Sequence, residues 1–167
     1  LRGADRIAVV SNQLGDRLIA EGVDADKISV VPNGVDASEF DPFPAREAVR
    51  EELGLSGAFV VGFAGSLKPW HGVDVLVRAF AELAERDRSA HLLLVGGGPG
   101  EADLRAAVAE KGLDHRVTFT GVIPHEEVPR LLRAMDVAVA PFLPMEGFYF
   151  SPIKLFEYMA SGACVIA

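Results

Sequence analysis

Short apolar runs alternate along the chain with longer segments whose apolar residues recur at helical spacing. The runs are rich in β-branched residues and are too short for helices, so they predict strands. These runs are Ile7–Val10, Ile28–Val31, Phe59–Phe63, Leu92–Val95, Val117–Thr120, Val137–Ala140 and Cys164–Ala167. The segments at helical spacing include 73–83, 104–109, 128–135 and 155–159. The alternation predicts an α/β fold with a Rossmann-like, doubly wound parallel sheet covered by helices on both faces.

The alternation is interrupted between residues 32 and 57. Pro32-Asn33-Gly34 is a turn signal, and two further prolines precede a polar helix candidate at Ala45–Leu53. We therefore predict three parts: residues 1–31 end one Rossmann-like domain, 32–57 connect two domains, and 58–167 contain five strands of the second. The chain begins without methionine and stops within a predicted strand. We expect it to be a piece of a longer protein, with the second domain incomplete at its C-terminus.

Composition narrows the functional classes. Half of the residues are apolar, which is enough for a sizeable core, and the formal net charge is −8. Such an acidic chain is a poor candidate for non-specific nucleic-acid binding. The single cysteine, Cys164, excludes an intrachain disulfide and a cysteine-rich zinc site, and the four histidines show no paired metal-ligand spacing. No apolar run approaches the roughly 18 residues of a membrane-spanning helix.

Ligands of open α/β sheets bind at the carboxyl ends of the strands, and one such end carries a glycine-containing loop. Residues 65–72 read Gly-Ser-Leu-Lys-Pro-Trp-His-Gly, between a predicted strand and a predicted helix. Glycines let backbone approach a ligand closely, and the start of a helix offers unpaired N–H groups. Lys68 and His71 add positive charge, so we expect a diphosphate to bind at Gly65, Ser66, Lys68 and His71. The alternative is an ordinary loop in which Trp70 packs.

Two further strand ends carry weaker signals. Residues 95–100 resemble the dinucleotide fingerprint G-x-G-x-x-G, but its third glycine position is occupied by Glu101. A structural turn is the better interpretation, with Glu101 and Asp103 in the first turn of the following helix. Backbone groups at Gly121, Val122 and Ile123 could contact the edge of a base, whereas we expect His125 to be a surface residue at the start of a helix.

The fourth strand end, from Pro141 to Glu157, combines aromatic residues with a helix start. We expect Ser151 to cap that helix and Pro152 to lie in its first turn. Lys154 and Glu157 share one face, which is consistent either with a surface ion pair or with a Glu157 that binds both hydroxyls of a ribose. The apolar neighbours of Glu157 favour a half-buried carboxylate, which would need a partner such as a hydroxyl-rich ligand. These neighbours are Leu155, Phe156 and Met159.

Five motifs occur in order along nearly the whole chain. They are Val31-Pro32-Asn33-Gly34-Val35-Asp36, Gly65-Ser66-Leu67 with His71-Gly72, Leu94-Val95-Gly96-Gly97-Gly98-Pro99, Val117-Thr118-Phe119-Thr120-Gly121 and Lys154-Leu155-Phe156-Glu157-Tyr158-Met159-Ala160-Ser161-Gly162. In their order and spacing they resemble the group 1 glycosyltransferases, the family 4 retaining enzymes of the GT-B fold.

The resemblance implies two Rossmann-like domains that face a cleft, of which the second holds a nucleoside-diphosphate sugar, usually without a metal. Residues 58–167 would then form the donor-binding domain, with Glu157 on the ribose and the backbone of 121–123 at the nucleobase. The glycine loop and the helix start at Pro152 and Ile153 would hold the diphosphate. The donor sugar would lie against a loop made of Phe148, Tyr149, Phe150 and Ser151.

The chain departs from the family at three positions. The family's glycine-loop arginine and lysine fall on Ser66 and His71, so Lys68 and a protonated His71 would have to supply the positive charge. The family's first glutamate falls on Tyr149, and Glu146, three residues earlier, resembles a displaced copy of it. We therefore name His71 and Glu146 as the candidate catalytic residues.

The implied reaction transfers a sugar from a nucleotide donor to the hydroxyl of an unidentified acceptor (a glycan, a lipid or a small molecule), with retention at the anomeric carbon. It would need no metal or other cofactor. Acceptor activation would come from outside the chain, so the chain alone is expected to show no turnover. We expect a cytoplasmic protein, whose contact with the inner face of a membrane would be peripheral and would use other regions.

Three alternatives remain from the sequence. A binding module without catalysis agrees with the departures at Ser66, His71 and Tyr149. A nucleotide-sugar epimerase of the same fold would use His71 or Glu146 as its acid and base. A dehydrogenase would have a third glycine in the loop that begins at Gly96, where this chain has Glu101.

Overall fold

The computed structural model describes residues 3–40, 45–144 and 151–167. The chain divides into two compact units. Unit 1 contains Leu1–Val35 and Pro144–Ile153, and unit 2 contains Asp36–Leu143 and Lys154–Ala167. The domain limits expected from the sequence stay predictions.

Unit 1 contains a parallel strand pair joined by a helix, as the sequence predicts. Its elements are β1 (Ile7–Val9), α1 (Asn12–Ala20), the 3₁₀ turn η1 (Ala25–Lys27) and β2 (Ile28–Val30). Val9, Leu18 and Val23 form a small core between strand and helix. The Ser11 hydroxyl accepts a hydrogen bond from the N–H of Leu14 and so caps α1.

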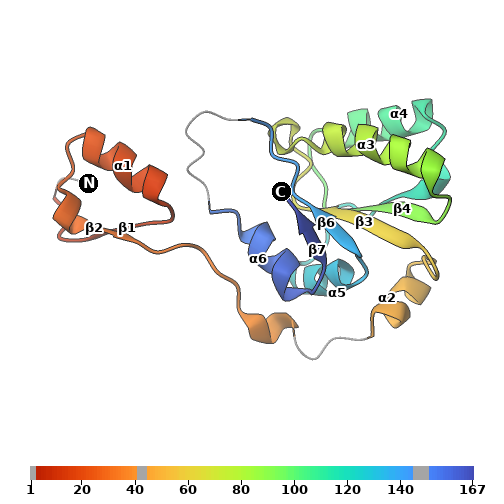
Figure 1. Cartoon of the computed structure of the whole chain (residues 1–167), viewed down its shortest axis with the longest axis horizontal. Helices are drawn as coiled ribbons and strands as arrows, with labels where there is room; N and C mark the ends of the chain where they lie inside the picture. Colours follow the sequence, from red (N-terminus) through yellow and green to blue (C-terminus); the bar gives the residue numbers. More distant parts are fainter. Residues whose placement is uncertain (1–2, 41–44, 145–150) are drawn as a thin grey trace. The chain divides into compact units, whose positions relative to one another are not determined.

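Unit 2 is built on a five-stranded parallel sheet with the order β5-β4-β3-β6-β7 (Figure 1). The central pair is in register from Phe59 opposite Ala90 to Ala64 opposite Val95, and both strands are buried along most of their length. Strands buried on both faces explain why the sequence shows continuous apolar runs here. The strands are β3 (Phe59–Ala64), β4 (Ala90–Val95), β5 (Val117–Phe119), β6 (Val137–Val139) and β7 (Cys164–Ile166).

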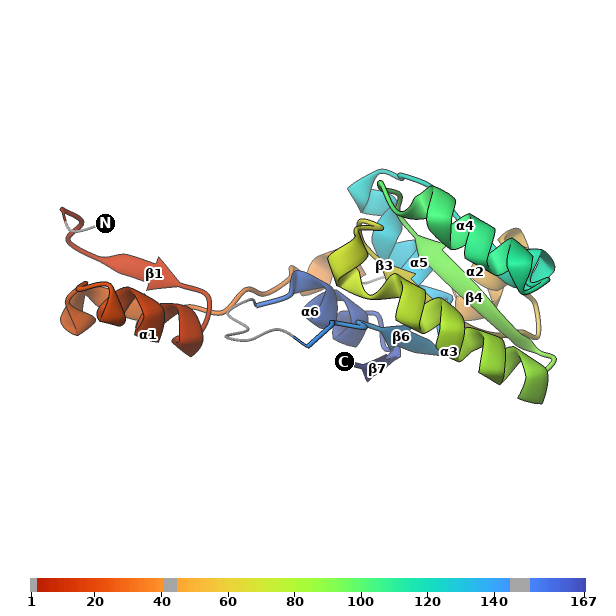
Figure 2. The same cartoon turned by 90° about the horizontal axis from the view of Figure 1, so that it is seen from above.

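Helices lie on both faces of this sheet, as the two views in Figures 1 and 2 show: α3 and α4 on one face, α5 and α6 on the other. This arrangement confirms the doubly wound α/β fold. The helices of unit 2 are α2 (Arg46–Glu52), α3 (Val73–Arg86), α4 (Glu101–Glu110), α5 (Val128–Arg133) and α6 (Ile153–Ala160). Short 3₁₀ turns are η2 (Ala37–Phe40), η3 (Pro69–His71), η4 (Asp114–Arg116) and η5 (His125–Glu127).

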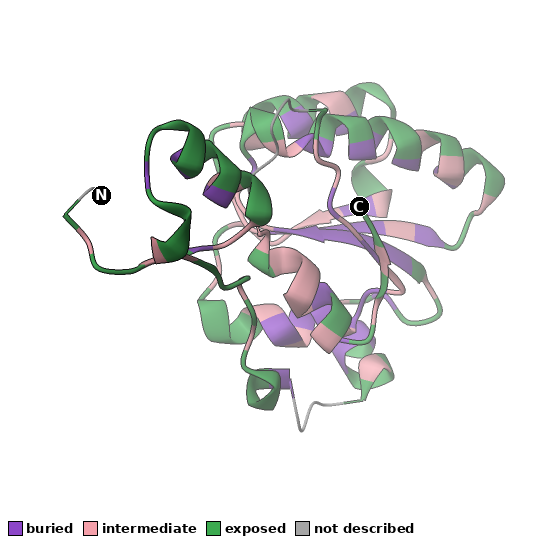
Figure 3. Ribbon diagram, turned by 60° about the vertical axis from the view of Figure 1, so that its left-hand side comes forward, coloured by how far each residue is buried: buried purple, intermediate pink, exposed green. Residues whose placement is uncertain are grey.

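The main core lies between the central strands and α3. Phe63, Leu92 and Leu94 of β3 and β4 have no exposed surface, and Val77 and Phe80 of α3 pack against them. Figure 3 shows the buried strands between layers of helix that are exposed on their outer faces. The predicted helical periodicity of 73–83 therefore corresponds to the apolar face of α3 that covers the sheet.

The helix predicted at 45–53 is present as α2, and a charge network joins it to the sheet. Arg50, 6% exposed, donates to the Asp136 carboxylate at 2.6 Å and to the carbonyl of Ala134 at 2.9 Å. Asp136 also accepts from Arg46 at 3.1 Å and from the N–H of Val60 at 2.8 Å. Burial raises the pKa of Asp136, but these donors outweigh it and leave the pKa below the ordinary value.

The prediction that Ser151 caps the last helix, with Pro152 in its first turn, is wrong. α6 begins at Ile153, so Pro152 precedes the helix instead of lying in its first turn. The Ser151 hydroxyl accepts from the backbone N–H of Asn33 at 3.1 Å, and the Ser151 carbonyl accepts from the Asn33 amide at 2.7 Å. A tertiary partner thus replaces the local capping interaction. In the described parts of the chain, no helix has the length and apolar character needed to cross a membrane.

Candidate functional site

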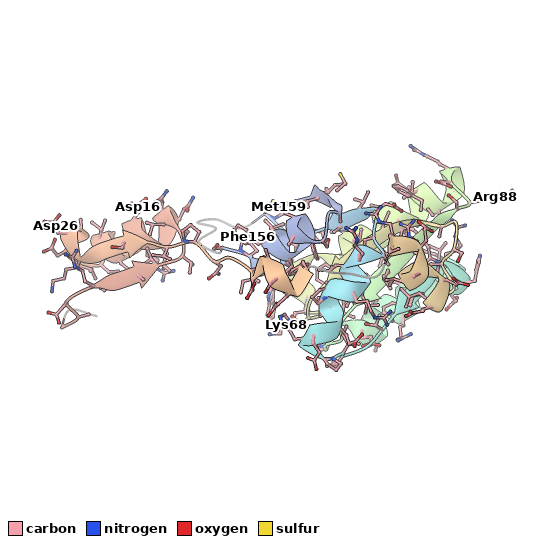
Figure 4. All side chains as sticks on the ribbon, turned by 90° about the horizontal axis from the view of Figure 1, so that it is seen from below. Asp16, Asp26, Lys68, Arg88, Phe156 and Met159 are labelled. Carbon is pink, nitrogen blue, oxygen red and sulfur yellow. The ribbon has the colours of Figure 1, made fainter. Side chains whose placement is uncertain are left out.

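The Gly65–Gly72 loop joins the carboxyl end of β3 to the start of α3, where the sequence placed it. Figure 4 shows Lys68 of this loop and Arg88, beyond the C-terminus of α3, at opposite ends of unit 2. Gly72 has φ +66°, and a Cβ atom there would lie 2.0 Å from the carbonyl oxygen of Pro141. A side chain at Gly72 is therefore excluded by backbone from the loop after β6.

The second glycine loop, after β4, packs directly on the first. A Cβ atom on Gly96 would lie 2.3 Å from the carbonyl oxygen of Gly65. The N–H of Leu67 donates to the Gly97 carbonyl at 3.0 Å, and the N–H of Gly100 donates to the Leu67 carbonyl at 2.8 Å. These glycines allow the close approach of two backbones, which is a structural role of the kind expected for residues 95–100.

His71 is hydrogen-bonded within its own loop. Its Nδ1 lies 2.6 Å from the carbonyl oxygen of Ser66, so Nδ1 carries a hydrogen and Nε2 is the free ring nitrogen. Burial lowers the pKa of His71, the Ser66 carbonyl raises it, and the positive charges of Lys154 and Lys68 lower it further. The net shift is downward. The positive charge expected on His71 would therefore require a bound anion to raise that pKa.

Trp70 does not pack in the interior, so the alternative interpretation of this loop is wrong on that point. The Trp70 side chain is 56% exposed, and the Nζ of Lys68 lies 4.9 Å from the centre of its ring. Lys68 is itself exposed. The loop therefore presents an aromatic ring and an ammonium group to solvent.

α6 is attached to the end of β3 by a buried tyrosine. The Tyr158 hydroxyl accepts from the N–H of Ala64 at 2.8 Å and donates to the carbonyl of the same residue at 3.2 Å. Tyr158 has no exposed surface, and burial raises the pKa of its hydroxyl. Because Ala64 directly precedes Gly65, this contact holds α6 beside the first glycine loop.

Lys154 lies one helical turn before Tyr158 and therefore reaches the same loop. Its Nζ is 4.2 Å from the ring centre of Phe63 and 5.6 Å from that of Phe142. A Cβ atom added to Gly65 would lie 3.0 Å from the same Nζ. Burial lowers the pKa of Lys154 to about 8, although the charge of Glu157 opposes this shift. The sequence also allowed a surface ion pair between Lys154 and Glu157. The ion pairs of the described residues do not include it.

Glu157 is half-buried, as its apolar neighbours predicted. Burial raises its pKa, the charges of His125 and Lys154 oppose this effect, and Glu39 adds to it. Leu155 and Phe156 are partly buried, whereas Met159 is 57% exposed; Figure 4 labels Phe156 and Met159 on α6. The buried contact of this helix is thus made by Tyr158, which the sequence interpretation did not single out.

The proposed nucleobase segment lies beside the second glycine loop. Gly121 forms an isolated bridge with Gly96, and Val122 is 86% exposed. A Cβ atom added to Gly97 would lie 2.9 Å from the Cγ2 of Val122. Ile123 is partly buried and His125 is exposed, which agrees with the expected surface position of that histidine. Residues 121–123 therefore lie next to the second glycine loop, with the side chain of Val122 exposed.

The remaining predicted residues belong to the loop before α6 or to its first residues. Glu146, Phe148, Tyr149 and Phe150 lie outside the described residues. Ser151 and Pro152 are partly buried, and Ile153 is 49% exposed. Within residues 3–40, 45–144 and 151–167, no three His, Cys, Asp or Glu side chains gather in a way that could hold a metal ion.

Comparison with known protein families gives two matches. Residues 58–167 match the family model described as "Glycosyl transferases group 1", and residues 1–39 match "Glycosyltransferase Family 4". A 2-deoxystreptamine glucosyltransferase of Streptomyces kanamyceticus is 39% identical over 84% of the chain. A D-inositol 3-phosphate glycosyltransferase of Nocardia farcinica is 38% identical over 98% of it. The chain spans 38% and 37% of these two relatives, which is less than half their length.

Solved structures show the same fold. Anabaena HepE in complex with UDP superposes with a TM-score of 0.83 at 28% identity, over 98% of this chain and 44% of that one. The same protein in complex with UDP-glucose gives a TM-score of 0.80 over 97% of this chain and 44% of that one. WaaG, described as a glycosyltransferase involved in lipopolysaccharide biosynthesis, is 22% identical to this chain and shares its fold, with a TM-score of 0.80 over 96% of this chain and 43% of its own. The chain belongs to the group 1, family 4 glycosyltransferases of the GT-B fold.

Proposed function

We propose that the chain is the donor-binding part of an enzyme that transfers a sugar from a nucleoside-diphosphate sugar to an acceptor hydroxyl, with retention of anomeric configuration. The named relatives are glycosyltransferases with different acceptors, and HepE binds UDP and UDP-glucose in its crystals. These names support a nucleotide-sugar donor and leave the acceptor open.

One observation carries this proposal: the Tyr158–Ala64 contact brings the helix that bears Glu157 to the glycine loop. Glu157 is half-buried, and its pKa is raised chiefly by burial, so the carboxylate gains from hydroxyl donors. A ribose diol offers two such donors. The backbone of residues 121–123 would then lie at the nucleobase.

Sugar transfer develops negative charge on the departing diphosphate as the bond to the anomeric carbon breaks. Donors fixed in advance around that charge lower the barrier because they need no reorganisation during the reaction. Backbone hydrogen bonds with Val95, Gly97 and Gly100 fix the Gly65–Gly72 loop, so groups carried by this loop would need little reorganisation. In a single step, retention results when the acceptor oxygen enters on the face from which the diphosphate leaves.

His71 and Glu146 remain the catalytic candidates of this proposal. Nε2 of His71 accepts a hydrogen bond in the neutral ring and donates one when the ring is protonated. A donor diphosphate next to His71 would favour the protonated form. Glu146 is proposed from its place in the sequence alone.

Isothermal titration calorimetry with UDP-, GDP- and ADP-glucose tests the binding step. We expect one of the three to bind, with no divalent metal required and so with equal affinity in EDTA. Failure of all three would contradict the proposal.

Product analysis tests the chemistry, with the full-length protein that carries this chain and the sugar nucleotide that binds. Transfer to an acceptor with an unchanged anomeric configuration is the expected result. Binding without any product would favour the non-catalytic module, which the serine at position 66 and the lowered pKa of His71 also suggest. Epimerised donor would favour the nucleotide-sugar epimerase.

A further inference from the structure

The glycine loop of this chain lacks both the arginine and the lysine that the family carries there. Helix α6 supplies a lysine close to the same loop. Ser66 has no charge, and the pKa of His71 is lowered in the free protein. Lys68, the remaining basic residue of the loop, is exposed and lies over the ring of Trp70. Lys154, by contrast, reaches the backbone of the loop: a Cβ atom added to Gly65 would lie 3.0 Å from its Nζ.

We propose that Lys154 of α6 is the cation that binds the donor diphosphate in this protein, in place of the arginine and lysine that the family carries in its glycine loop. This inference rests on the proposed function, because it assigns a residue to the same donor site. It differs from the expectation from the sequence, in which Lys154 was only a partner for Glu157.

The surroundings of Lys154 support a ligand as its partner. Its ammonium group lies over Phe63 and beside Phe142, and among the described residues it has neither a hydrogen-bond acceptor nor an ion-pair partner. A half-buried charge without a partner is costly, and the lowered pKa of Lys154 expresses that cost. An anion bound at Gly65 would offset it.

The helix that carries Lys154 is also held in place against the end of β3. Tyr158 holds α6 to both backbone groups of Ala64, and Lys154 is on the same helical face one turn earlier. Gly65 leaves room above Phe63, since a side chain there would meet Nζ at 3.0 Å. The ammonium group of Lys154 thus lies beside the backbone of Gly65, at the start of the first glycine loop.

The test compares wild type with Lys154→Gln and Lys154→Arg by titration with the best binder among UDP, GDP and ADP, and with the corresponding nucleoside. Loss of a charge-assisted contact predicts at least about tenfold weaker diphosphate binding for Lys154→Gln. Nucleoside affinity, followed by NMR, should stay within about twofold, because the base and ribose contacts are unchanged. Lys111→Gln, at the exposed C-terminal cap of α4, is the matched control and should bind like wild type.

A pH titration of wild type provides a second measurement that needs no variant of uncertain stability. The free protein loses the Lys154 proton as pH rises through about 8, so diphosphate affinity should fall above that pH. Lys154→Arg keeps its charge and should show no such fall. Among the described residues, the charge of Glu157 acts on Lys154, and the charges of Lys154 and Lys68 both act on His71.

Each outcome distinguishes this inference from the proposed function. If wild type binds none of the three nucleotides, the proposed function itself fails. If wild type binds but Lys154→Gln binds the diphosphate within about twofold, the assignment of Lys154 alone is overturned. Equal losses for diphosphate and nucleoside would also overturn it, because they would indicate a structural role for the lysine.

Discussion

At the scale of single residues, Glu157 and Lys154 show how one short helix carries two chemically different groups. They lie three positions apart on α6, and neither is exposed as a surface charge would be. Burial raises the pKa of the carboxyl group and lowers that of the ammonium group. Both residues therefore lack full hydration in the free protein, which is typical of groups that meet a polar ligand.

The role of Glu157 on a ribose predicts a specific loss. Wild type should bind a 2′-deoxynucleoside diphosphate about tenfold more weakly than the ribonucleotide, because one hydrogen bond to a charged acceptor is lost. Glu157→Gln should bind both nucleotides with affinities within about threefold of each other. Calorimetry with the two nucleotides measures this difference.

The exposed Glu110→Gln, at the end of α4, is the control and should discriminate as wild type does. The preference of wild type for ribose should also decline as pH falls through the raised pKa of Glu157, because the carboxylate is then protonated. Unchanged discrimination in Glu157→Gln would remove this residue from the ribose site.

At the scale of elements, the site depends on loops that approach each other without side chains between them. Gly96 faces the carbonyl of Gly65, and Gly72 faces the carbonyl of Pro141. The sequence showed glycine-rich loops at these places, but glycine occurs both at ligand sites and at tight turns. Contacts between loops that are distant in sequence show which glycines are needed for a close approach of backbones.

Gly72→Ala should destabilise unit 2 more than Gly112→Ala, although both glycines have φ +66°. At Gly112 nothing lies within 4 Å of the new Cβ, so only the backbone conformation is unfavourable, at about 1 kcal/mol. At Gly72 the Cβ also overlaps the Pro141 carbonyl, which adds about 1–3 kcal/mol. Urea unfolding of the two variants measures both costs, and equal losses would show that the loop shifts without penalty.

At the scale of the whole molecule, α2 is joined to the sheet of unit 2 by charge as well as by apolar packing. Asp136 accepts from two arginines of α2 and from the backbone of β3. Because donors lower its pKa below the ordinary value, Asp136 stabilises the fold above the unfolded pKa, and this contribution is lost as pH falls through the folded pKa.

Asp136→Asn should therefore lower the free energy of unfolding at neutral pH by about 2–4 kcal/mol, since Arg50 loses its buried partner. The difference from wild type should shrink as pH falls below the ordinary aspartate pKa of about 4, and it should vanish only below the lowered pKa of folded Asp136, where the wild-type side chain is protonated as well. Asp74→Asn, which removes an exposed ion pair with Arg78 on α3, should cost less than about 1 kcal/mol. A constant difference for Asp136→Asn at all pH values would contradict this account.

The sequence by itself determined the order of strands and helices, the doubly wound sheet, the position of the glycine loop and the half-buried state of Glu157. These features depend on neighbours within a few residues, whose periodicity and turn residues are visible in one dimension. Tertiary structure alone decided that Tyr158 binds Ala64, 94 residues away, that Ser151 binds Asn33 instead of capping α6, and that Lys154 reaches Gly65. Such contacts depend on how separate elements pack, and no local pattern encodes which residue meets which across the sheet.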